Sequence, residues 1–160
     1  MNTAAAQPED HARHRLLIPI DATAASKWGI AHALRIHREA GPVAVCLLYI
    51  VAPVCHWTVR RFRTEQEIHR HFEARSRVFL EEAARPLRDA GIVCHGLFRE
   101  APPVPGILDL AEQLGCTGIV VPAPGWPDLL GRSLARRLQR ARRGTPITLA
   151  RPPAALERAT

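Results

Sequence analysis

The sequence lacks the features that mark secreted, membrane-spanning and zinc-binding proteins. Its four cysteines, Cys46, Cys55, Cys94 and Cys116, form no CxxC pair, so we expect reduced thiols rather than disulfides. The first fifteen residues contain no apolar segment, which argues against a signal peptide. The longest apolar run, residues 43–54, is too short to cross a bilayer, which needs about 20 residues. These absences predict a cytoplasmic protein.

Aromatic residues are also scarce. They make up 5% of the chain, so aliphatic side chains must supply most of a hydrophobic content of 47%. A chain of 160 residues is long enough for one domain with a substantial core. We therefore predict a single domain over residues 14–152, with a disordered tail at 1–13 and a loose C-terminal tail at 153–160.

Lysine is nearly absent, and arginine supplies the positive charge. Lys27 is the only lysine, and residues 129–160 contain eight arginines against Glu157, which matches the net charge of +7 of the whole chain. We interpret this region first as a solvated helix face. The alternative is a surface that attracts a phosphate ligand, nucleic acid or anionic lipid.

Apolar segments alternate with segments of helical periodicity. Apolar runs predict strands at 16–20, 43–51, 92–98, 118–121 and 146–150. Helices are predicted after Thr23, from Thr64, and over 104–114 and 129–143. This alternation predicts an α/β fold, a single doubly wound parallel sheet with helices on both faces. Ligands of such sheets bind beyond the carboxyl ends of the strands, where the strand order reverses.

Local patterns add detail to these helices. Small residues such as Gly29 fall on one face of the first helix, which favours close packing on the sheet. Thr23 is a candidate cap for that helix, and Thr64 with Glu67 forms a capping-box pattern for the next. In the last helix we expect Leu134, Leu138 and Ala141 to be buried.

The segment TGIVVPAPGWPDLLGRS, residues 117–133, is the strongest candidate for a functional site. It begins as a buried strand, continues as a loop with three prolines and Gly125, and enters a helix near Ser133. A strand, a glycine-containing loop and a helix N-terminus form an arrangement that proteins use to bind phosphate. The loop here is poor in glycine and rich in proline.

Three segments in order resemble the universal stress protein family, over roughly residues 14–152. They are RLLIPIDATAAS at 15–26, LLYIVAPV at 47–54, and IVVPAPG at 119–125 followed by GRSLARRLQRARRGTPITLARP at 131–152. The resemblance implies a Rossmann-like sheet of five strands in the order 3-2-1-4-5. It also implies a role in stress response and a homodimer formed through the last strand, Pro146–Ala150. The apolar edge of that strand is a separate reason to expect dimerisation.

Many members of this family bind ATP through a motif that reads Gly-x2-Gly-x9-Gly-Ser/Thr. Here Pro122 stands where the first glycine belongs, and Gly125 matches the second. Gly131 matches the third after a shortened interval, and Arg132 intervenes before Ser133, which takes the hydroxyl position. Because Pro122 has no N–H and a fixed φ, it removes a donor where the backbone should approach the ligand.

The resemblance also assigns the segment Pro19-Ile20-Asp21 and Val51 to the site. Asp21 is expected near the ribose or the phosphates, and Val51 beside the adenine. The resulting hypothesis is a homodimeric binding or regulatory module, not an enzyme, that takes ATP, with Mg²⁺, in a degenerate glycine loop. One alternative is a nucleotide-free member that acts by protein contact through Trp126 and the arginine-rich helix. Another is a slow ATP hydrolase that depends on Asp21.

Other chemistry is less well supported. Asp21 could be a phospho-acceptor, but no acidic pair lies nearby to hold a divalent ion; it could equally cap the next helix. Cys55-His56 with His69 and His71 lacks the tight spacing of a metal site. The G-x-S-x-G pattern of a serine nucleophile is absent from the sequence. We expect no metal site of this kind, no nucleophilic catalysis, and neither nucleic acid nor a membrane as partner.

Overall fold

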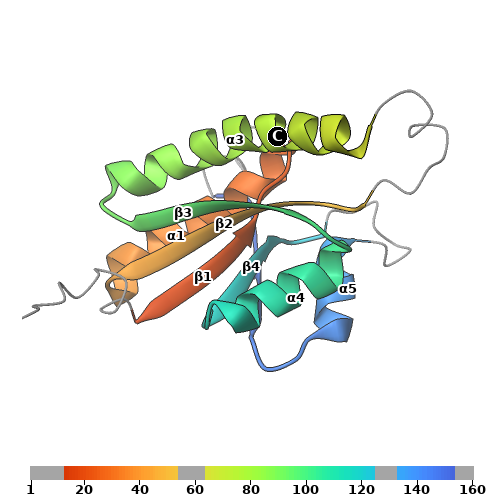
Figure 1. Ribbon diagram of the computed structural model, residues 1–160. Coiled ribbons are helices and arrows are strands. Elements are labelled where there is room, and N and C mark those ends of the chain that lie inside the picture. Colours follow the sequence, from red (N-terminus) through yellow and green to blue (C-terminus); the bar gives the residue numbers. More distant parts are fainter. Residues whose placement is uncertain (1–12, 54–63, 125–132, 154–160) are drawn as a thin grey trace, which may run out of the picture.

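The computed structural model describes residues 13–53, 64–124 and 133–153, which form one parallel sheet covered by helices on both faces (Figure 1). Its elements are β1 (His14–Pro19), η2 (Ala24–Ser26), α1 (Lys27–Ala40), β2 (Val43–Val51), α3 (Glu65–Asp89), β3 (Val93–Glu100), α4 (Pro103–Gln113), β4 (Gly118–Pro122), α5 (Leu134–Ala141) and β5 (Ile147–Ala150). The strands lie in the order β3-β2-β1-β4-β5, and each neighbouring pair is parallel. The predicted fold class and strand order are confirmed.

Helices lie on both faces of the sheet (Figure 1), and the core has one layer on each face. Successive residues of β1 alternate between them, so that Ile18 packs in the α1 and α3 layer and Leu17 in the α4 and α5 layer. Both side chains are fully buried, which stabilises the fold by about 1.5–3 kcal/mol for each. Strands covered on both faces read as continuous apolar runs, which is why the sequence located them.

Helix α1 approaches the sheet closely, as its small residues predict. Gly29 is buried, and a Cβ atom at this position would lie 2.7 Å from Cγ2 of Ile18. The helix begins as the 3-10 turn η2 and ends at Gly41, whose φ of 101° favours glycine. Thr23 occupies the predicted N-cap position, ahead of η2, but its side chain makes no cap hydrogen bond, because its hydroxyl donates to Asp21 instead.

Helix α3 begins with the predicted capping box. The Glu67 N–H donates to Oγ1 of Thr64 over 3.3 Å, and the Thr64 N–H donates to Oε2 of Glu67 over 2.9 Å. These two bonds satisfy backbone donors that the first turn of a helix leaves unpaired. Within the described ranges, neither this helix nor any other is long and apolar enough to span a membrane.

Helix α5 is shorter than predicted. Residues 129–132 of the predicted helix lie outside the described residues, and the described helix begins after Ser133 and ends at Ala141. Arg142 adopts extended backbone angles (φ −51°, ψ 140°), so the chain leaves the helix two residues before the predicted end. As a result Ala141 is exposed, and the prediction that it is buried is wrong. Leu138 is buried as expected.

Candidate functional site

A cleft of about 420 Å³ opens at the carboxyl ends of β1, β2 and β4. It lies between β1 and β4, where the strand order reverses, and therefore occupies the position at which doubly wound sheets bind their ligands. Five of the predicted site residues line this cleft: Pro19, Ile20, Asp21, Pro122 and Ser133. The two chain reversals after β1 and β4 thus meet at one edge of the sheet. Gly125, Gly131 and Arg132 lie outside the described residues.

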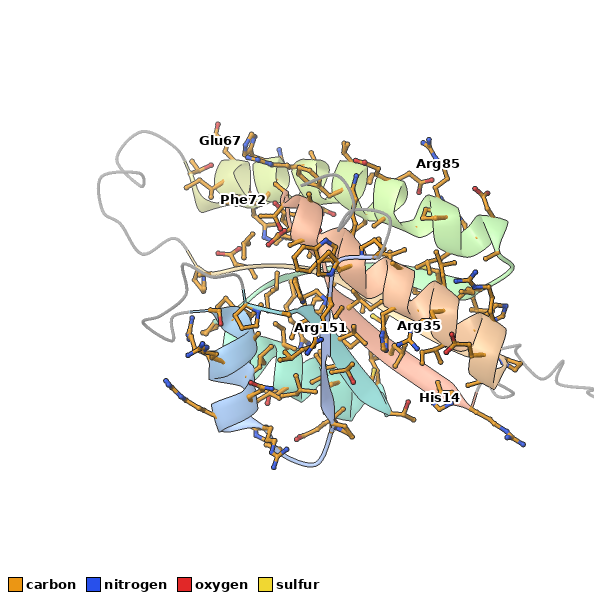
Figure 2. The ribbon with its side chains drawn as sticks, turned by 180° about the vertical axis from the view of Figure 1, so that it is seen from behind. His14, Arg35, Glu67, Phe72, Arg85 and Arg151 are labelled. Atoms are coloured by element: carbon orange, nitrogen blue, oxygen red, sulfur yellow. The ribbon has the colours of Figure 1, made fainter. Side chains whose placement is uncertain are left out.

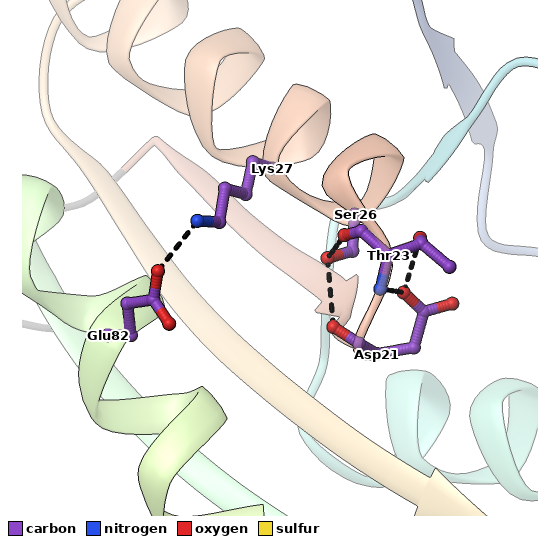
Figure 3. A network of polar contacts seen from close by, with 5 residues as sticks. All are labelled: Asp21, Thr23, Ser26, Lys27 and Glu82. Atoms are coloured by element: carbon purple, nitrogen blue, oxygen red, sulfur yellow. Dashed lines mark hydrogen bonds and ion pairs between the residues drawn. The ribbon is translucent and has the colours of Figure 1, made fainter.

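Asp21 organises the turn that forms one wall of this cleft (Figure 3). Its Oδ1 accepts hydrogen bonds from the N–H and the Oγ1 of Thr23, over 2.7 and 2.5 Å. The Ser26 hydroxyl then donates to the Thr23 carbonyl over 2.8 Å and lies 3.2 Å from the Asp21 carbonyl. One carboxylate oxygen therefore holds the turn. Among the described residues Oδ2 has no hydrogen bond, so it is available to a ligand.

The last residue of β4 and the two that follow it offer no backbone donor to a ligand. Pro122 and Pro124 have no N–H, and the N–H of Ala123 donates to the Ala150 carbonyl over 2.7 Å. A phosphate cannot be wrapped by residues 122–124 in the way that a glycine-rich loop wraps it. Recognition of an anion in this cleft must therefore come from elsewhere.

The start of α5 provides that alternative. Ser133 is its N-cap and accepts a hydrogen bond from the Arg136 N–H over 3.2 Å, while Leu134 and Ala135 of the first turn line the cleft. A helix N-terminus carries unpaired N–H groups and a partial positive charge. Arg137, which follows Ser133 by one turn, also lines the cleft and brings a full positive charge. The sequence reasoning missed Arg137, although its spacing of four from the cap was a usable signal.

From the end of β2 it is Ile50, and not the predicted Val51, that lines the cleft. Ile50 lines the cleft, whereas Val51 packs against the core layer of α1 and α3 on the other face of the sheet. Since side chains alternate along a strand, a shift of one residue exchanges the two faces. Ile50, Val121 and Pro103 give the cleft an apolar part, and the start of α5 with Arg137 gives it a charged part.

Within the described ranges, histidine and cysteine side chains do not gather into a metal-binding cluster. Among the described residues no group of three or more His, Cys, Asp or Glu side chains is placed to hold a metal ion. His69 lies 3.1 Å from Glu100, and Cys55 and His56 of the proposed cluster are outside the described residues. Burial raises the pKa of Cys46 to about 12 and that of Cys94 to about 11, so neither thiol is ionised near neutral pH.

Several solved structures with this fold are of universal stress proteins. A protein of that family from Burkholderia pseudomallei is 18% identical, with a TM-score of 0.67 over 88% of this chain and 96% of its own. An Arabidopsis thaliana member with AMP bound is 14% identical, with a TM-score of 0.63 over 89% and 94%. A universal stress protein in complex with cAMP is 16% identical, with a TM-score of 0.66 over 86% and 96%.

The chain is similar to these proteins in fold and not in sequence. No protein-family profile matches the chain, and no curated protein matches it either. The chain therefore has the fold of universal stress proteins, and the resemblance noticed in its sequence is confirmed at that level.

Proposed function

We propose that this protein is a cytoplasmic binding and regulatory module of the stress response that takes an adenine nucleotide, and that it is not an enzyme. The observation that carries the proposal is the cleft in which the Asp21 turn and the start of α5 meet at the reversal of strand order. Proteins of the same fold have been solved with AMP and with cAMP.

Each part of the cleft suits a part of the ligand. The apolar wall around Ile50 and Val121 suits the base, and the free Oδ2 of Asp21 suits a ribose hydroxyl. The N-terminus of α5 and Arg137 suit the phosphates. ATP with Mg²⁺ is the form that the family resemblance implies. AMP has a single phosphate, so it requires fewer backbone donors than ATP from a loop whose first residues have no free N–H.

Arg137→Ala tests this assignment of the phosphate end. We expect the variant to bind AMP and Mg²⁺-ATP about tenfold more weakly in calorimetric titrations, because a charge-assisted bond to phosphate contributes about 1.5–3 kcal/mol. Arg140→Ala is the matched control, since Arg140 is exposed on the same helix and does not line the cleft. Its affinity should change less than about twofold, as expected for screened surface charge.

Two results would contradict the proposal. The first is the absence of nucleotide in a denatured preparation together with no heat of binding for AMP, cAMP or ATP. The second is an equal loss of affinity in both arginine variants, which would assign the binding to general charge attraction rather than to the cleft.

We also propose a homodimer formed through β5. This strand pairs with β4 on one side and is an edge of the sheet on the other. Unpaired edge strands are templates for association, and a second copy of the same strand would satisfy the outer edge.

A further inference from the structure

A second groove, of about 570 Å³, lies away from the cleft, between α1 and the β5 edge. Trp28, His32, Arg35 and Arg38 line it from α1, and Thr148 and Arg151 line it from β5 and the residue that follows. Figure 2 shows Arg35 and Arg151 between these two elements. Its volume falls in the range of small-molecule sites, roughly 300–1,000 Å³.

Three guanidinium groups share this groove, and in the described part of the chain Glu39 is the one carboxylate paired with any of them. Arg35 is held from two sides: Nη1 donates to Glu39 over 3.0 Å, and Nη2 donates to Nδ1 of His32 over 3.1 Å. For Arg38 and Arg151 the described residues provide neither an ion pair nor a hydrogen bond. Positive charge is therefore gathered here and only partly compensated.

A solvated helix face does not account for this arrangement. Arg38 and Arg151 are far apart in the sequence, and folding brings them to opposite walls of one concave surface. A groove lined by charge of one sign concentrates counter-ions, and a guanidinium binds phosphate oxygens in a fixed, two-pronged geometry. Trp28, which is half-buried and lines the groove from α1 as Arg38 does, offers an apolar surface beside these charges.

We propose that this groove is a second binding site, for a small anion with at least two neighbouring phosphate groups that Arg38 and Arg151 hold from opposite walls. Arg35, fixed by Glu39 and His32, adds positive charge without having to be reorganised. The site is separate from the cleft, with which it shares no lining residue. It does not depend on the cleft binding a nucleotide.

The test is a calorimetric titration of the full chain with inorganic tripolyphosphate at low ionic strength. The double variant Arg38→Ala/Arg151→Ala should bind at least about tenfold more weakly, because it loses two charge-assisted contacts. The matched control is Arg70→Ala/Arg85→Ala, which removes the same charge from exposed positions on α3, away from the groove (Figure 2 labels Arg85). Its affinity should change less than about twofold. Circular dichroism would verify that both variants are folded.

A third variant separates the groove from the cleft. Arg137→Ala removes a charge from the cleft and none from the groove, so tripolyphosphate affinity that survives in this variant and is lost in Arg38→Ala/Arg151→Ala belongs to the groove. If Arg137→Ala loses the affinity and Arg38→Ala/Arg151→Ala keeps it, the phosphate binds in the cleft and the proposal is overturned. Equal losses in the two double variants, or no binding to the unchanged protein, would overturn it as well.

Titrating ATP into Arg137→Ala, and into the groove variants made in that background, distinguishes the source of the phosphates, because the cleft then contributes less to the binding. Equal affinity for ATP and tripolyphosphate, lost together in the groove variant, indicates that the groove recognises phosphate alone. Tighter binding of ATP that is lost in Trp28→Leu indicates that the groove also contacts the base, and both results support the site.

Discussion

Burial controls the chemistry of the described cysteines. Their thiol pKa values are raised chiefly because burial disfavours the charged thiolate, to about 12 for Cys46 and about 11 for Cys94. Since the thiolate is the reacting species, we expect iodoacetamide at pH 8 to label Cys46 at least about tenfold more slowly in the folded protein than in urea. Timed labelling followed by peptide mass spectrometry measures both rates.

The same experiment contains its own comparison. Cys94 is only partly buried, so it should react earlier than Cys46 in the folded protein. Rapid labelling of Cys46 under folding conditions would contradict this account. It would mean that β2, the strand on which Cys46 lies, opens readily.

At the scale of elements, the contact between α1 and β1 depends on a missing side chain. A methyl group at Gly29 would lie 2.7 Å from Cγ2 of Ile18, and a β-branched side chain has little freedom to turn away. Gly29→Ala gains about 1 kcal/mol of helix propensity but forces α1 from the sheet at a cost of about 1–3 kcal/mol. We expect a net loss of stability, measured as a lower urea midpoint.

Gly144→Ala is the control for this substitution. A Cβ atom at Gly144 meets nothing within 4 Å, and its φ is not in the left-handed region, so the midpoint should stay the same or rise slightly. A midpoint for Gly29→Ala equal to that of the unchanged protein would show that α1 can shift without loss of packing.

Elements were predictable where one local pattern was sufficient. The capping box of α3 needs only Thr64 and Glu67, and the buried strands need only an apolar run. Which face of β2 meets the cleft was not predictable in this way, because a fully apolar strand gives no sign of its alternation. For this reason the sequence did not reveal that Ile50, rather than Val51, lines the cleft. The predicted end of α5 was also wrong, because the sequence gives no sign that the helix stops before Arg142 and Arg143, which are both compatible with a helix.

The candidate site was predictable in position but only partly in composition. Asp21, Pro122 and Ser133 follow or precede recognised elements, so their meeting at one edge of the sheet follows from parallel topology. Arg137 lines the cleft through its helical phase, and the groove of Arg38 and Arg151 depends on the packing of α1 beside β5. Neither arrangement leaves a contiguous motif in the sequence.

At the scale of the whole molecule, the free edge of β5 determines how two copies can meet. The Pro146 carbonyl accepts a hydrogen bond from the Ile119 N–H of β4 over 2.9 Å, and the Ala150 carbonyl accepts one from the Ala123 N–H, just after β4, over 2.7 Å. Because alternate residues of a parallel strand point to opposite sides, the backbone groups of Ile147 and Leu149 face outward. A second β5 running antiparallel could pair with them, and a two-fold axis at Thr148 would place each Thr148 opposite its copy.

This symmetry makes Thr148 a sensitive position. Thr148→Lys adds a positive charge beside Arg151 and sets two like charges across the axis, which destabilises a strand pair. We expect its dimer dissociation constant to rise at least about tenfold in sedimentation velocity experiments, while Thr148→Val, which keeps the shape of the side chain, remains dimeric. If the unchanged protein sediments at 17.7 kDa at every concentration, the β5 interface does not form. If Thr148→Lys is as dimeric as Thr148→Val, the two copies meet elsewhere, because a charge on the axis of the β5 pair would weaken the dimer.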